Sequence, residues 1–262
     1  QVTGTVGFFH HQGCCQLPPD LDRVTETLIS LGCSPNVGAA LIVSLGCEGT
    51  DTERLYEMIR ATGKPVEIIR IQELGGVSAA IKAGIDAAQE LVMEISGMQR
   101  QAVDISRVTM SIKCGASDTT SGMASNCVIG YVADKLVDLG ATVVFGETTE
   151  FLGGEHLLAR RAVTLEVGQK ILDIVDRMEK RARSLGCDMR KGQPTPGNIA
   201  GGLSSIEEKS LGAIVKSGTR PIQGVLEYPE RIGERKGLWI KDTPGREPEI
   251  LTGMAATGAQ FM

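Results

Sequence analysis

The segment Lys113-Cys114-Gly115-Ala116-Ser117-Asp118-Thr119-Thr120-Ser121-Gly122-Met123-Ala124-Ser125-Asn126 joins two predicted elements. The apolar run 108–112 before it is typical of a buried strand, and the amphipathic pattern over 124–139 after it predicts a helix. Open α/β sheets bind ligands in such polar loops, where the carboxyl end of a strand leads into a helix. The segment therefore indicates an α/β fold with a binding site here. The alternative is an ordinary turn in which Ser125 or Asn126 caps the helix.

Buried strands and helices alternate on both sides of this segment. Before it, the sequence predicts strands at 3–9, 39–45 and 66–71, and helices from Pro18 to Gly32, at 52–61 and at 77–95. The pattern then restarts with strands at 107–112 and 141–145 and a charged helix at 163–185. Strands without polar alternation, separated by helices, predict parallel sheets covered by helices on both faces.

The restart divides the chain into parts. We predict two Rossmann-like lobes with parallel sheets flanked by helices, the first over 1–105 and the second over 106–190. A Pro/Gly-rich loop at 192–203 opens a C-terminal elaboration over 191–262, packed on the second lobe. Cys14 and Cys114, like Gly46 and Gly146, stand 100 positions apart, which indicates a weak internal repeat.

Composition excludes several functions. Lys plus Arg number 27 against 32 Asp plus Glu, and the net charge of −5 argues against binding to nucleic acid or to a membrane surface. The odd count of 7 cysteines and the lack of a signal peptide indicate a reducing cytoplasm. No apolar run approaches the length of about 18 residues that a membrane span needs. A first residue Gln and an end without a polar tail suggest an excised piece of a longer protein.

Chemically active side chains follow two neighbouring strands of the second lobe. The first loop carries Lys113, Cys114, Ser117, Asp118 and Ser121, and the second carries Glu147, Glu150, Glu155 and His156. Both loops leave a parallel sheet at the same edge, so we expect these groups to converge. Carboxylates such as Asp118, Glu147 and Glu155 suit Mg²⁺ or Mn²⁺, whereas thiol and imidazole groups favour Fe²⁺ or Zn²⁺. His156 or Lys113 is the expected acid or base.

The first lobe carries a second set, which we expect to face the first. His11, Cys14, Cys47 and Glu48 are candidate metal ligands in two of its loops, although their spacing matches no closed zinc template. Inert, partly buried side chains are an equal alternative there. A further alternative is an iron–sulfur or redox protein that uses Cys14, Cys15, Cys47 and Cys114.

Together these motifs resemble the altronate/galactarate dehydratase family. The resemblance rests on 113–126, on Gly146-Glu147-Thr148-Thr149-Glu150, on Glu155-His156 through Ala162, and on the loops at Gly13-Cys14-Cys15 and Gly46-Cys47-Glu48. Pro194-Thr195-Pro196-Gly197-Asn198, Gly201-Gly202-Leu203 and Glu207 to Ser210 fit as well. One departure is Ala116, which stands where the family motif has a second glycine after the cysteine.

The resemblance implies a lyase that removes water from an altronate- or galactarate-type sugar acid through an enolate. The implied cofactor is a divalent metal, with Fe²⁺ first and Mn²⁺ or Mg²⁺ as alternatives. The same family includes sulfolactate sulfo-lyase, which eliminates sulfite to give pyruvate, and 145–151 reads closer to that branch. A non-catalytic sugar-acid-binding domain is the remaining alternative. We also expect a homo-oligomer and a small N-terminal domain or separate small subunit.

Overall fold

The structure is a computed structural model that describes residues 2–10 and 12–262. It divides into two compact units, which are described separately. Unit 1 holds the residues up to Ala102 together with Ala256–Gly258, and unit 2 holds Val103–Ala255 with Ala259–Met262. Among the described residues, no helix is both long and apolar enough to cross a membrane.

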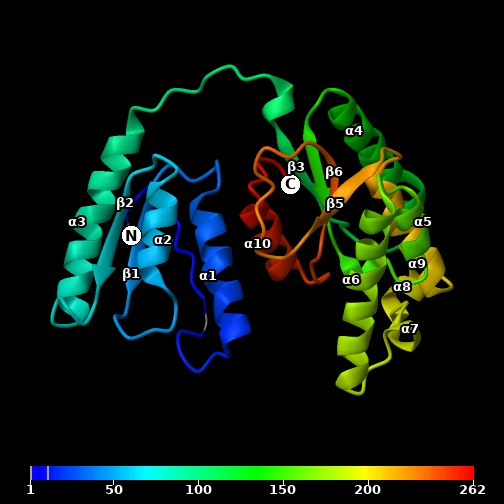
Figure 1. The fold of residues 1–262 in the computed structure, drawn as a ribbon, viewed down its shortest axis with the longest axis horizontal. Helices are drawn as coiled ribbons and strands as arrows, with labels where there is room; N and C mark the ends of the chain where they lie inside the picture. Colours follow the sequence, from blue (N-terminus) through cyan, green and yellow to red (C-terminus); the bar gives the residue numbers. More distant parts are fainter. Residues whose placement is uncertain (1, 11) are drawn as a thin grey trace. The chain divides into compact units, whose positions relative to one another are not determined.

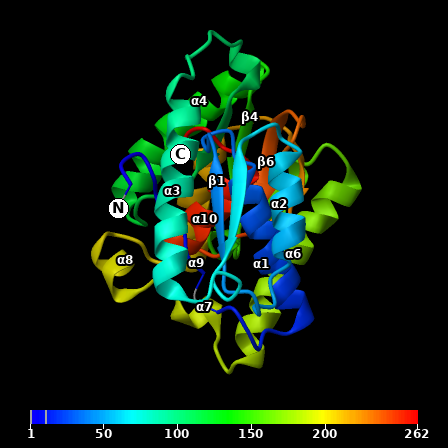
Figure 2. The same cartoon turned by 90° about the vertical axis from the view of Figure 1, so that its left-hand side faces the viewer.

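Unit 1 is a small α/β layer structure. Strands β1 (Ala40–Ser44) and β2 (Val66–Arg70) pair in parallel, with Ala40 opposite Val66 and Ser44 opposite Arg70. Helix α3 (Val77–Ser96) covers one face of the pair, and α1 (Pro18–Gly32) and α2 (Thr52–Arg60) lie on the other (Figures 1 and 2). The buried core consists of Ile29, Ile42, Leu55, Ile59 and Val66.

The prediction of a strand at 3–9 is wrong. These residues form no strand, and the backbone makes only a turn in which the Thr5 N–H donates to the Val2 carbonyl. Val6 and Phe9 remain 95% and 88% exposed, so their β-forming side chains are not packed on either face. A β-rich run becomes a strand only when a neighbouring strand offers its edge and a face to pack on.

Unit 2 contains a four-stranded parallel sheet. Its strands are β3 (Thr109–Ile112), β4 (Thr142–Phe145), β5 (Ile222–Leu226) and β6 (Gly237–Lys241), in the spatial order β3-β4-β6-β5. Outside the named strands, Phe261 forms a parallel bridge with Met110 at the β3 edge, and the Ser111 N–H donates to the Phe261 carbonyl over 2.8 Å. Parallel sheets in both units confirm the predicted fold class.

The segment 191–262 is more central than an elaboration packed beside the sheet. It supplies β5 and β6, and β6 is inserted between β4 and β5 in the interior of the sheet. Both strands are only five residues long and are bounded by Gly or Pro turns. The two strands also include polar residues such as Gln223 and Lys241, so they do not show the continuous apolar run of β4, and the sequence pattern resembles a peripheral extension.

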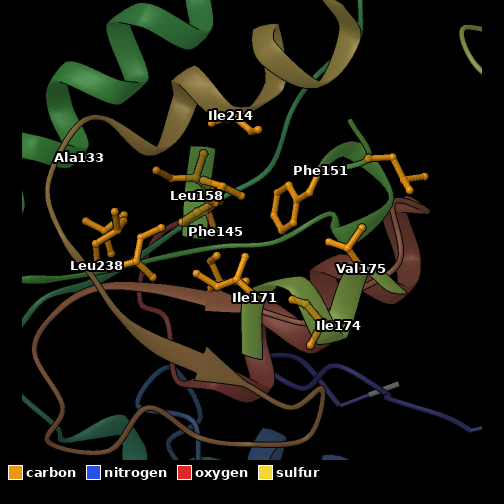
Figure 3. Packing of buried hydrophobic residues seen from close by; sticks show 14 of the residues in the cluster. Ala133, Phe145, Phe151, Leu158, Ile171, Ile174, Val175, Ile214 and Leu238 are labelled. Atoms are coloured by element: carbon orange, nitrogen blue, oxygen red, sulfur yellow. The ribbon is translucent and has the colours of Figure 1, made fainter. Parts of the chain in front are cut away.

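Helices surround this sheet, and some of them pack on its two faces. They are α4 (Asn126–Asp138), α5 (Glu155–Arg160), α6 (Leu165–Ser184), α7 (Met189–Gly192), α8 (Pro196–Ala200), α9 (Ile206–Ile214) and α10 (Glu247–Thr257), with short turns η1 (Ile105–Arg107), η2 (Ser121–Ser125), η3 (Thr148–Glu150) and η4 (Val215–Ser217). Phe145 packs with Ile171 and Ile174 of α6 (Figure 3), whereas its neighbour Val144 belongs to a second cluster with Met254 of α10. This alternation follows from successive strand side chains pointing to opposite faces.

Strand β6 ends in a lysine that is fully buried. The Lys241 ammonium donates to the Glu230 carbonyl over 2.7 Å. Burial lowers the pKa of Lys241 to about 7, although the nearby Glu230 carboxylate opposes the shift. At neutral pH this side chain is therefore divided between its charged and neutral forms.

We expect the stability of unit 2 to rise with pH because of Lys241. A lysine in the unfolded chain titrates near about 10.4, so between pH 7 and that value the unfolded state binds more protons than the folded state. The free energy of unfolding should therefore increase across this window by roughly 4 kcal/mol, and the gain is lost as the pH falls towards 7. Urea unfolding of the wild type and of Lys241→Met from pH 6.5 to 9.5 measures the effect. Parallel pH profiles for the two proteins would contradict it.

Candidate active site

The loops after β3 and β4 meet at the carboxyl edge of the unit 2 sheet. The backbone N–H of Cys114 donates to Glu147 Oε2 over 2.8 Å, and the Ser117 hydroxyl donates to Glu150 Oε1 over 3.0 Å. The two strands are adjacent and parallel, with Ile112 opposite Phe145, so both loops begin at the same level. This convergence confirms what the parallel-sheet prediction required.

A third segment places a lysine between the two carboxylates. Lys216, in the turn η4, forms an ion pair with Glu147 Oε2, and its Nζ lies 3.5 Å from Glu150 Oε2. The side chain of Lys216 is 0% exposed and that of Glu147 is 3% exposed. We call Glu147, Lys216 and Glu150 the buried ion cluster. Removing such charges from water is costly, and mutual pairing offsets that cost.

The Cys114 thiol lies beside the buried ion cluster, and burial is the main influence on its pKa. Burial raises the pKa of Glu147, and the Lys216 ammonium opposes this shift. Burial alone would lower the pKa of Lys216, but Glu147 and Glu150 outweigh it and hold that pKa above its ordinary value. Burial likewise raises the pKa of Cys114 against the opposing effect of Lys216. At neutral pH the lysine is therefore charged, and Cys114 is a protonated thiol.

Backbone geometry directs Glu147 towards Cys114. Glu147 has the left-handed φ of 72°, which is uncommon for residues other than glycine, and its N–H donates to Thr243 Oγ1 over 2.8 Å. The preceding residue must be glycine, because a Cβ on Gly146 would lie 2.4 Å from Thr243 Oγ1. Non-glycine residues in sparsely populated backbone regions cluster at functional sites. Here the turn bends the carboxylate back beneath the neighbouring strand end.

Cys114 also lines a cavity of about 280 Å³. Its polar lining includes Ser117, Asp118, Ser121, Asn126, Glu208 and Lys209. One wall is the π-helical turn η2, a rare conformation that is frequent at functional sites. No side chain caps α4 at Ser125; instead the Asn126 amide donates to the Gly212 carbonyl over 2.8 Å and lies 3.6 Å from Cys114 Sγ. Neither Ser125 nor Asn126 is therefore the cap that the alternative of an ordinary turn named, and Asp118 accepts from the Ser121 N–H at the start of the helical run instead.

The predicted residues of unit 2 fall into two groups. Cys114, Ser117, Asp118 and Ser121 line the cavity, and Glu147 lies directly behind Cys114. The other three lie elsewhere: Lys113 pairs with Glu247 over 2.6 Å, Glu155 is 3.8 Å from Arg190, and His156 is exposed on α5. The structure does not bring these three to the cavity wall.

The candidate set of unit 1 occupies two adjacent loops. The Gly49 N–H donates to the Gly13 carbonyl over 2.9 Å, which joins the loop of Cys14 to that of Cys47 and Glu48. Cys47 Sγ accepts from the Gln72 amide at 3.3 Å, and Glu48 Oε2 accepts from the Gly46 N–H at 2.7 Å. His11, the fourth predicted ligand, lies outside the described residues.

The donor groups do not by themselves form a metal centre. Over residues 2–10 and 12–262, no three His, Cys, Asp or Glu side chains group in a way that could hold a metal ion. In unit 2, Glu147 is already engaged by the Lys216 ammonium and the Cys114 N–H, so a cationic side chain takes the place next to this carboxylate. The described residues alone therefore do not form a complete set of metal ligands, and the predicted ligand His11 lies outside them.

Sequence patterns did not single out Lys216. It is remote in sequence, 69 residues from Glu147, and stands in a short apolar run. The one signal was this context, because Ile214-Val215-Lys216 places a lysine where the flanking residues are expected to be buried. A lysine is almost never fully buried unless it is paired.

Comparison with known protein families identifies the family of this chain. Residues 105–262 match the model of the C-terminal domain of D-galactarate/altronate dehydratase, and residues 1–96 match the second domain of D-galactarate dehydratase/altronate hydrolase. The chain belongs to the D-galactarate/altronate dehydratase family.

Individual relatives carry different activities in their names. The chain is 41% identical to the (2R)-sulfolactate sulfo-lyase subunit beta of Chromohalobacter salexigens, over 98% of this chain and 66% of that protein. It is 31% identical to altronate dehydratase of Bacillus subtilis, over 97% of the chain and 50% of the relative. It is 34% identical to the L-threo-forming galactarate dehydratase of Escherichia coli, over 89% and 46%. The chain thus spans about half to two thirds of the length of these relatives.

Proposed function

We propose that this chain carries the catalytic cavity of a lyase that eliminates a β-substituent from a small 2-hydroxy carboxylic acid. The observation that carries the proposal is the position of Cys114, which lines the cavity and whose backbone N–H donates to Glu147 of the buried ion cluster. Membership of a family whose named members are dehydratases and a sulfo-lyase supports the reaction class. A volume of about 280 Å³ lies near the small end of ligand sites, roughly 300 Å³ and upward, as a small acid requires.

The chemistry needs one group that accepts a proton and another that donates one. Elimination breaks the Cα–H bond, and its electron pair forms the enolate while the β-substituent departs. The Ser117 hydroxyl already donates to Glu150, so it can receive the α-proton as its own proton passes to that carboxylate. The Cys114 thiol, whose pKa is raised, can donate a proton to a departing hydroxyl or to the β-carbon of the enol product.

The two candidate leaving groups, hydroxide and sulfite, differ in whether they need a proton donor. Hydroxide must be protonated as it leaves, whereas sulfite departs as a stable anion. The identity of 41% to the sulfo-lyase subunit, against 31% and 34% to the two dehydratases, supports sulfite as the leaving group. We therefore place sulfolactate first among substrates. Dehydration of altronate or galactarate, the reaction predicted from the sequence, is the second candidate.

Other features stay predictions. A divalent cofactor (Fe²⁺, Mn²⁺ or Mg²⁺), a homo-oligomer and a cytoplasmic location are expected from the sequence. A small accompanying subunit or domain is also expected, and the designation of one relative as subunit beta supports it.

Assay of the full-length protein tests the reaction. Reduced protein, supplied anaerobically with Fe²⁺, Mn²⁺ or Mg²⁺, is offered sulfolactate, altronate and galactarate, and keto acid and sulfite are measured separately. We expect pyruvate and sulfite in equal amounts from sulfolactate. Keto acid from a sugar acid without sulfite would favour the dehydratase. No product from any of the three substrates would contradict the lyase proposal and leave a binding domain as the better interpretation.

A further inference from the structure

Lys209 lines the cavity, and among the described residues no carboxylate pairs with its ammonium. It belongs to α9, and its Nζ donates to Gln193 Oε1 over 2.7 Å and to Asn198 Oδ1 over 3.2 Å. Both partners are neutral amides, so neither compensates the positive charge. Lys113 and Lys216 differ in this respect, because each is paired with a carboxylate. An ammonium group has three N–H donors, and the two amide contacts use two of them.

Hydrogen bonds fix this lysine relative to Cys114. The Asn198 amide that accepts from Lys209 also donates to the Ser117 carbonyl over 3.0 Å. Asn198 in turn is held by a reciprocal capping box with Thr195 at the start of α8. The Thr119 N–H donates to the Gly201 carbonyl over 3.0 Å and secures the other end of the same loop. Lys209 is thus positioned before any ligand arrives, which reduces the entropy cost of binding.

Two carboxylates on the cavity wall limit where an anion can sit. Asp118 Oδ1 accepts from the Thr120 hydroxyl and the Ser121 N–H, both at 2.7 Å. Glu208 Oε2 accepts from the N–H and the hydroxyl of Ser204, at 2.7 and 2.6 Å. The pKa values of both groups are lowered by these hydrogen bonds, so they are anionic at neutral pH. They repel acid groups but can accept hydrogen bonds from hydroxyl groups.

We propose that Lys209 binds the carboxylate of the substrate, while the hydroxyl groups of that substrate face the acidic part of the wall. This inference rests on the proposed function, because it assigns the acid-binding position of the same cavity. The arrangement selects a hydroxy acid: the acid group needs the cation, and the hydroxyls tolerate neighbouring carboxylates. If the bound carboxylate is the one that gains charge in the enolate, Lys209 also stabilises the transition state.

Equilibrium binding of tartronate to the full chain tests Lys209 without requiring turnover. Tartronate is a 2-hydroxy diacid that has no β-leaving group, so it reports the acid-binding position alone. By isothermal titration calorimetry we expect Lys209→Gln to bind tartronate at least about tenfold more weakly than the wild type, as loss of a desolvated charge partner requires. The matched control is Lys191→Gln, which removes the same charge from a side chain that is 87% exposed, and its affinity should be unchanged.

A second variant acts in the opposite direction. Glu208→Gln removes a negative charge from the wall and keeps an amide oxygen for Ser204, so tartronate should bind several-fold more tightly. Equal affinities of the wild type, Lys209→Gln and Glu208→Gln would overturn the assignment, as would a wild type that does not bind tartronate. The binding measurement and the product assay can fail independently. Absence of product in the assay would contradict the proposed function, whereas unchanged tartronate affinity would contradict the role of Lys209. In a protein that turns over, Lys209→Gln should raise KM, with a fall in kcat as well if the enolate is the stabilised species.

Discussion

Lys216→Met is expected to lower the free energy of unfolding of unit 2 by about 3–5 kcal/mol, the usual cost of removing one partner from a buried ion pair. Glu147 would remain buried and Glu150 mostly buried without the ammonium that lies between them. The pKa of Glu147, already raised by burial, should rise further once Lys216 no longer opposes it. The folded variant would then bind more protons than its unfolded state, so its stability should fall as the pH rises above the carboxyl range. Urea unfolding at pH 5 and pH 8 measures both effects.

Lys241→Met is the matched control for this prediction. Lys241 is equally buried, but its ammonium donates to a backbone carbonyl rather than to a carboxylate. Its removal leaves no buried anion, so at neutral pH we expect little loss of stability or a gain. The double variant Lys216→Met with Glu147→Gln should recover part of the loss. Equal destabilisation by the two single lysine variants would show that burial, and not the ion cluster, decides the cost.

Cys114→Ser is expected to reduce kcat at least about 100-fold, the lower range for loss of a positioned acid or base. A serine hydroxyl occupies nearly the same place but is a far weaker proton donor than the thiol. The backbone N–H bond from residue 114 to Glu147 does not involve the side chain, so the fold around it should be retained. Product formation from the substrate identified in the assay, together with a thermal unfolding curve, measures the two effects.

Cys127→Ser, in helix α4, provides the comparison. Cys127 is exposed, and its thiol donates to the Gly122 carbonyl over 3.3 Å. We expect its kcat to stay within about twofold of the wild type, as surface substitutions away from a site usually do. Full activity in Cys114→Ser would contradict the assignment of Cys114 as the proton donor. The donor would then have to be another group of the cavity.

Much of the fold was predictable because the apolar runs are short and clearly bounded. Val143, Val144 and Phe145 form a run whose residues are all buried, and Asp51 caps α2 by accepting from the Arg54 N–H, as its position before the helix suggests. The run at 3–9 also contains β-forming residues, but it includes Gly4 and Gly7 and pairs with no strand in the described part of the chain. The place of β6 inside the sheet depends on tertiary pairing with two other strands, which local pattern does not reveal.

The site was predictable only to the extent that strand geometry determines it. Adjacent residues at a strand end point in opposite directions, so Cys114 and Lys113 cannot both face the cavity. Applied to the sequence, that rule would have excluded Lys113 from the predicted catalytic residues. In the structure Lys113 pairs with Glu247 instead. Lys209 and Lys216 come from a helix and a turn far along the chain, and their place depends on how α9 packs.

The insertion of β6 between β4 and β5 has a consequence for the nascent chain. A ribosome that has released β3, β4 and β5 has not yet supplied the strand that separates β4 from β5. Until residue 241 has emerged, β4 therefore exposes an unpaired edge and an apolar surface. Long-range parallel pairing of this kind folds slowly and leaves aggregation-prone edges open in the meantime. We therefore expect unit 2 to be most prone to aggregation during synthesis, before β6 closes the sheet.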